Sequence, residues 1–93
     1  MSNPAARKGD TDDKSHTITG GTIDTVKIEG SPAAVKGSTM DDGVSISSGV
    51  SATVRINGSY AAVVTSVTDA HTKDPGKKQP GTINSGAGTV KIG

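Results

Sequence analysis

The sequence predicts an all-β fold, a small pseudo-threefold repeat of β-hairpins that resembles a β-prism and contains little or no helix. Three observations support this prediction. An eleven-residue segment recurs along the chain, each copy begins with alternating polar and apolar residues, and the stretches between copies are rich in Gly, Ser and Thr. Alternation with period two is typical of half-buried strands, and glycine-rich intervals disfavour helices.

The repeated segment is complete twice and split once. Residues 25–35 read TVKIEGSPAAV, and residues 53–63 read TVRINGSYAAV. Residues 89–93 (TVKIG) match its first half, and residues 3–7 (NPAAR) match its second half. The chain is therefore a circularly cut set of three units, and such a repeat decides the fold.

The spacing of the units locates an insertion. Thr25 and Thr53 are 28 residues apart, whereas Thr53 and Thr89 are 36 apart. The third unit therefore carries eight extra residues. They fall around residues 72–81, where Pro, Gly and Lys have loop chemistry throughout.

Each unit is predicted to be a strand, a tight turn, an Ala-Ala segment, an irregular excursion and a return strand. In the first copy Val26 and Ile28 point to one face, and their polar neighbours point to the other. The turn follows at Glu29-Gly30 and at Asn57-Gly58, since Asn-Gly tolerates positive φ at both positions.

One such unit cannot bury its apolar face alone, so we expect the three units to close around an axis. Closure also removes exposed strand edges. An open β-meander is the alternative. The closed arrangement pools like residues into three triangles: Ile18, Ile46 and Ile83; Val26, Val54 and Val90; Ile28, Ile56 and Ile92.

Composition limits both the core and the partners. The 93 residues predict one domain, 1–93, with a poor core, because Tyr60 is its single aromatic residue. There is no cysteine, so a disulfide cannot staple it. A net charge of +1 argues against nucleic-acid binding, and Lys77-Lys78 is predicted to be a solvated loop tip. No apolar stretch follows the N-terminus, so we expect no signal peptide.

Residues 4–7 read PAAR and are followed by Gly9-Asp10. Together with the TVxIxG strands and the threefold period, this sequence closely resembles the PAAR-repeat family over its whole length. The resemblance implies a small cone of β-hairpins. It implies that a single chain sits on the blunt end of a trimeric β-helical spike, sharpens it and often carries effector proteins. The spike belongs to a contractile injection machine, a type VI secretion apparatus or a phage tail.

The resemblance also implies a metal near the apex, usually zinc, held by His and Cys side chains. This chain offers His16 and His71 and no Cys. The two histidines fall at nearly the same place in units one and three, so the threefold brings them together. We expect the set to be completed by Asp42, Asp69, Asp13 or water. Imidazole with carboxylate does not select zinc sharply over iron or nickel.

Two alternatives for these polar residues remain open. The histidines could be exposed loop residues without a metal. The cluster Asp10, Asp12 and Asp13 lacks the Gly and Glu of an EF-hand loop, so a solvated turn is predicted there.

The predicted function is mechanical, with no enzymatic turnover: a spike tip that aids membrane piercing as part of an assembled particle, secreted or in a virion, after synthesis in the bacterial cytoplasm. Docking on the spike, one chain per trimer, is assigned to the strand ends near Gly30, Gly58 and Gly93. A carbohydrate-binding module is the rival, although such sites usually present several aromatic rings.

Overall fold

The computed structural model describes residues 3–71 and 80–92. Within these ranges the chain forms short antiparallel strands in several small sheets and no helix, which confirms the all-β prediction. The described chain accordingly has no helix long and apolar enough to cross a membrane. The strands are β1 (Asn3–Ala5), β2 (Ile18–Gly20), β3 (Ile23–Ile28), β4 (Ser31–Ala33), β5 (Thr39–Met40), β6 (Ile46–Ser48), β7 (Arg55–Ile56), β8 (Ser59–Tyr60), β9 (Val67–Ala70), β10 (Pro80–Thr82) and β11 (Ala87–Ile92).

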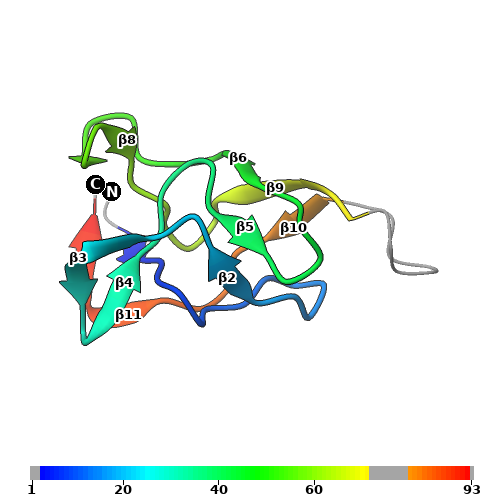
Figure 1. Cartoon of the computed structure of the whole chain (residues 1–93), viewed down its shortest axis with the longest axis horizontal. Coiled ribbons are helices and arrows are strands. Elements are labelled where there is room, and N and C mark those ends of the chain that lie inside the picture. The colour runs from blue at the N-terminus through cyan, green and yellow to red at the C-terminus, as the bar shows by residue number, and fades with distance from the viewer. Residues whose placement is uncertain (1–2, 72–79, 93) are drawn as a thin grey trace.

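Three equivalent β-hairpins gather at one end of the long axis, at the left of Figure 1. They pair β3 with β4, β7 with β8, and β11 with β1. The first two turn at Glu29-Gly30, with φ of 49° and 86°, and at Asn57-Gly58, with φ of 52° and 87°. Two successive positive φ values are what a two-residue hairpin turn requires. The third hairpin joins strands from opposite ends of the chain and so closes the set.

A ring of backbone hydrogen bonds joins the three units at the Ala-Ala segment. The N–H of Ala6 donates to the carbonyl of Ala62 (3.0 Å), that of Ala62 to Ala34 (3.0 Å), and that of Ala34 to Ala6 (3.1 Å). Each alanine occupies the same place in its unit. The closed threefold arrangement, and not an open meander, therefore describes this chain.

The core consists of two thin layers along the axis. The layer beside the hairpins contains Ile28 and Ile92, with Ile56 packed partly against them. The second layer contains the triangle Ile18, Ile46 and Ile83, each at most 1% exposed, together with Met40. Two of the predicted triangles are thus the core of the molecule. One alanine of each Ala-Ala pair belongs to each layer: Ala5, Ala33 and Ala61 to the first, and Ala6, Ala34 and Ala62 to the second.

The valine triangle differs from the prediction. Val54 and Val90 pack partly against the first layer, but Val26 is 38% exposed. The cause lies in the register of β3, where Ile23 pairs with Ala33 but Lys27 already pairs with Pro32. Such a bulge breaks the period-two alternation, so residues within it are no longer held on the core face.

One position shows how the repeat tolerates change. Gly9 and Gly37 have φ of 97° and 95°, and Thr65, the equivalent residue in the third unit, has φ of 89°. The N–H of all three donates to the carbonyl of a core isoleucine, for example Thr65 to Ile83 at 2.8 Å. A β-branched residue at positive φ is strained, so the third unit keeps this bond at a conformational cost.

Candidate metal centre

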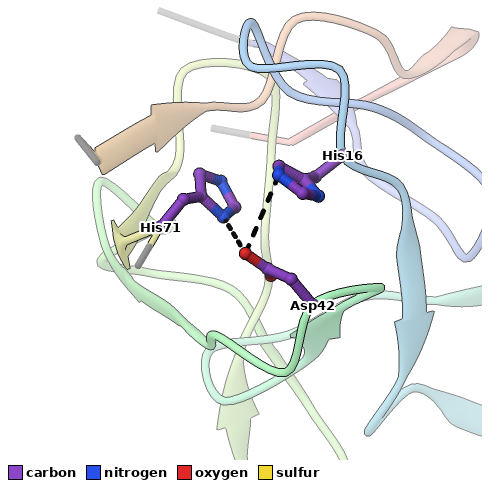
Figure 2. A group of neighbouring side chains, drawn as sticks. All are labelled: His16, Asp42 and His71. Carbon is purple, nitrogen blue, oxygen red and sulfur yellow. Dashed lines mark hydrogen bonds and ion pairs between the residues drawn. The ribbon is translucent and has the colours of Figure 1, made fainter. Parts of the chain in front are cut away.

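Two histidines and an aspartate from three different units meet at the end of the molecule away from the hairpins. His16 lies two residues before the start of β2, Asp42 lies in the turn after β5, and His71 directly follows β9. Figure 2 shows the three side chains converging from separate stretches of the chain. One ligand atom from each lies within 4.8 Å of the others.

The contacts within this group are short. The Nδ1 of His71 lies 2.6 Å from Oδ2 of Asp42, and Nε2 of His16 lies 3.7 Å from the same oxygen (Figure 2). The two imidazole rings stack, with centroids 4.1 Å apart and an interplanar angle of 23°. Asp42 is therefore the residue that the two histidines share.

Two further carboxylates complete the surroundings of the rings. Oδ2 of Asp12 lies 2.6 Å from Nε2 of His71, and Oδ1 of Asp41 contacts Nδ1 of His16. Asp12 is itself fixed, because its Oδ1 accepts the backbone N–H groups of Lys14 (3.0 Å) and His16 (2.9 Å). Both ring nitrogens of each histidine thus face carboxylate oxygens.

Several ionisable side chains of this site are buried, and burial disfavours the charged form of such a group. The side chain of His71 is fully buried, as is that of Asp12, and the side chain of Asp42 is 6% exposed. Burial raises the pKa of Asp42, but the hydrogen bonds from His71 and from the Val44 N–H, with the charge of the imidazoles, outweigh it and hold the pKa below its usual value. The shared carboxylate is therefore ionised at neutral pH.

Gly81 of β10 closes the site on the side of Asp12. A Cβ at this position would lie 2.0 Å from Oδ2 of Asp12 and 2.8 Å from Nε2 of His71. The N–H of Gly81 donates to Oγ1 of Thr68 at 2.9 Å, and that hydroxyl lies 3.5 Å from Nε2 of His71. Only glycine leaves room for the contact between Asp12 and His71.

The residues fit a divalent metal ion. Imidazole nitrogen and carboxylate oxygen are ligands of zinc and of iron. Ligand atoms about 2.1 Å from one ion lie about 3.0–3.4 Å from each other, and the observed 2.6 and 3.7 Å separations bracket that range. Three carboxylates around two imidazoles carry an excess of negative charge, which a divalent cation would offset. His16, Asp42 and His71 could therefore hold an ion, and its identity is not fixed by this set.

The predicted ligands are placed as follows. His16, His71 and Asp42 come together, and both histidines are buried, so the alternative of exposed loop histidines is wrong. Asp69 is exposed on β9 and lies outside the group. Asp13 is also outside the group, and its Oδ1 accepts the N–H of Thr82 at 3.0 Å.

The positions assigned to docking are at the hairpin end. Gly30 and Gly58 are exposed turn residues, and a Cβ on either would meet no atom within 4 Å. Gly93 lies outside the described residues, as do Lys77-Lys78 and most of the insertion.

The prediction of a solvated turn for the acidic cluster holds for Asp13, which is exposed, and is wrong for Asp10 and Asp12. Asp10 and Asp12 are 5% and 3% exposed. Asp10 accepts hydrogen bonds from Arg7 Nη2 (3.2 Å) and from the Arg7 N–H (2.8 Å), and Asp12 faces His71. The 28-residue spacing could have indicated the burial of Asp12, because it aligns this residue with Met40 and Thr68, which are both buried.

Comparisons with models of protein families, with curated proteins and with solved structures found no match to this chain.

Proposed function

We propose that this chain is the tip of a trimeric β-helical spike in a contractile injection system, a type VI secretion apparatus or a phage tail. The observation that carries the proposal is the closed hydrogen-bond ring of Ala6, Ala34 and Ala62, which makes one chain pseudo-threefold. A single polypeptide with three similar faces is suited to cap three identical chain ends. The PAAR-like residues 4–7, which contribute Ala6 to this ring, support the same function.

The hairpin end is the proposed docking surface. It presents three equivalent strand pairs, two of which end in similar turns at Glu29-Gly30 and Asn57-Gly58. Within the described residues β3 pairs only with β4, which leaves its other edge for a partner strand. It also carries Val26, the large apolar side chain that is exposed in the described chain. A trimer whose strands end in a flat face would bury these edges and this valine.

The histidine end is the proposed point. Its ligand candidates come from three units, so an ion held by His16, Asp42 and His71 would cross-link all three at the end opposite the hairpins. Such a staple suits a chain with no cysteine and one aromatic residue, in which metal binding adds directly to folding energy. The function is then mechanical: a small, stapled point that contacts a target membrane briefly, with effector proteins as further cargo.

Isothermal titration of the full chain into the spike trimer from the same source tests this function. We expect one chain per trimer. Val26→Asp should weaken binding about tenfold or more, because it places a charge in the buried interface. The matched control is Ala70→Asp, the same kind of change on an exposed residue of β9 at the other end. Absence of binding would overturn the function, and weakening by Ala70→Asp alone would reverse the orientation.

The carbohydrate-binding alternative has less support. The chain has one aromatic ring, Tyr60, and the guanidinium of Arg55 lies over its face, 4.5 Å from the centroid. Nη2 of Arg55 also donates to the Tyr60 hydroxyl at 2.7 Å. One of the two faces of the Tyr60 ring is therefore already covered by Arg55 and is not open to a sugar.

A further inference from the structure

We infer that Asp12 and Asp41 are positioning residues of the metal centre, which fix the two histidines in opposite tautomers so that His71 offers Nδ1 and His16 offers Nε2 to the ion. This inference rests on the metal site of the proposed function. It adds two residues that do not touch the ion but decide which nitrogens do.

His71 lies between two carboxylates. Both ring nitrogens of His71 lie 2.6 Å from a carboxylate oxygen, Nε2 from Oδ2 of Asp12 and Nδ1 from Oδ2 of Asp42. The two carboxylates differ in their other contacts, because Nε2 of His16 also faces Asp42, whereas Asp12 is held by backbone N–H groups. An ion held by Asp42 and both histidines would take Nδ1 of His71, the nitrogen that faces Asp42, and would leave Nε2 to donate to Asp12. Thr68 is compatible with this, because its hydroxyl donates to the carbonyl of the next residue (2.9 Å) and can accept from Nε2 at 3.5 Å.

His16 shows the same arrangement with the nitrogens exchanged. Its Nδ1 contacts Oδ1 of Asp41, whereas its Nε2 is turned toward Oδ2 of Asp42. Oδ2 of Asp41 also accepts the N–H of Thr17 at 3.3 Å, which helps to hold the carboxylate beside the ring. Each histidine thus has one nitrogen on a positioning carboxylate and the other on the shared ligand.

The position of Asp12 is set by the backbone and not by His71 alone. Its Oδ1 is occupied by the N–H groups of Lys14 and His16, so Oδ2 is the oxygen left for His71. Glycine at position 81 permits the contact, because a Cβ there would collide with both Oδ2 of Asp12 and Nε2 of His71. Carboxylates bound to the outer nitrogen of a ligating histidine orient the ring and raise its basicity, and losing one weakens metal binding about tenfold to a hundredfold.

Asp12→Asn tests the positioning role of Asp12 most directly. The asparagine Oδ1 can still accept the N–H groups of Lys14 and His16, so the turn is kept. Its amide then presents an N–H to Nε2 of His71, which moves the ring proton to Nδ1, the nitrogen needed for the ion. We expect Zn²⁺ to bind this variant about tenfold to a hundredfold more weakly. Asp69→Asn is the matched control, because it removes the same charge from an exposed position, and we expect its affinity to be unchanged.

The direct readout is a long-range ¹H–¹⁵N spectrum of the full chain loaded with Zn²⁺, recorded beside a Zn²⁺ titration. The expected result is a protonated Nε2 on His71 and a protonated Nδ1 on His16. The reverse tautomers, or equal Zn²⁺ affinity for Asp12→Asn and the unaltered chain, would overturn the inference and leave the metal site intact. No Zn²⁺ binding by the unaltered chain would overturn the metal site and this inference together, whereas spike binding is measured separately.

Discussion

The hairpin end and the histidine end of this molecule use the threefold repeat in different ways. At the hairpin end both backbone and side chains repeat, as in the isoleucine layer of Ile28, Ile56 and Ile92. At the histidine end the backbone still repeats: the N–H groups of Asp13, Asp41 and Asp69 donate to the carbonyls of Thr82, Thr17 and Ser45, the residues that precede the core isoleucines.

The side chains at the histidine end do not repeat. Of the three equivalent aspartates, all of them exposed, Asp41 contacts His16, the side chain of Asp13 accepts the Thr82 N–H, and Asp69 contacts neither histidine in the contacts described above. The repeat thus provides three equivalent backbone positions, and side chains that differ between the units provide the candidate metal ligands. Changes at repeated positions should affect the fold, and changes at unrepeated ones should affect the site.

The largest expected effect separates two residues of one strand. Ile28→Asp places a charge in the first core layer, where the side chain is 6% exposed. The lost burial and the buried charge should cost about 4 kcal/mol or more, most of the stability of a small domain. Circular dichroism should show an unfolded chain at 25 °C. Val26→Asp, two residues away but exposed, should melt within a few degrees of the unaltered chain; equal loss in both variants would contradict the described register of β3.

The next effect breaks the histidine end alone. Gly81→Ala forces a Cβ against Oδ2 of Asp12, so we expect a loss of about 1–3 kcal/mol from overpacking and loss of Zn²⁺ binding. Gly88→Ala is the control, since a Cβ there meets no atom within 4 Å, and it should change stability by less than about 0.5 kcal/mol. Chemical denaturation and metal titration measure both. Normal Zn²⁺ binding by Gly81→Ala would show that the contact between Asp12 and His71 is not needed.

A smaller effect tests whether repeated positions are energetically equivalent. Oγ of Ser38 accepts the Val35 N–H at 2.9 Å, and Oγ of Ser66 accepts the Val63 N–H at the same distance. Both serines are fully buried. Ser38→Ala and Ser66→Ala should each cost about 1–2 kcal/mol, because a buried N–H loses its acceptor. Urea denaturation should give two values that agree within about 0.5 kcal/mol; a wide difference would mean that the units are alike in shape only.

The smallest effect should be a gain. Thr65→Gly restores in the third unit the residue type that Gly9 and Gly37 supply in the other two. Relief of the strained φ outweighs the greater entropy of glycine in the unfolded chain, so we expect a net stabilisation of about 0.5–1 kcal/mol. Thermal unfolding measures it. A loss of stability would show that the Thr65 side chain contributes more than its strain costs.

The repeat made most of the fold predictable, because a period of 28 residues marks equivalent places before any contact is known. It placed Ile18, Ile46 and Ile83 in one core layer, and it aligned His16 with His71 closely enough to bring them together. Val26 could not be predicted, since the bulge in β3 depends on pairing with β4. Asp12 was missed because a carboxylate next to other carboxylates has the composition of a solvated turn, and its burial depends on Gly81 and His71, which lie far along the chain.

The central claim is the proposal that one pseudo-threefold chain caps the three identical chains of a spike and holds one metal ion. Native mass spectrometry of the full chain mixed with the trimeric spike protein from the same source tests it most directly. We predict a complex of three spike chains with one copy of this chain, and an added mass of one divalent ion that disappears in the His16→Ala/His71→Ala variant. Three copies of this chain per trimer, or a chain that remains free, would contradict the cap. A complex of the predicted stoichiometry without added mass would contradict the metal centre.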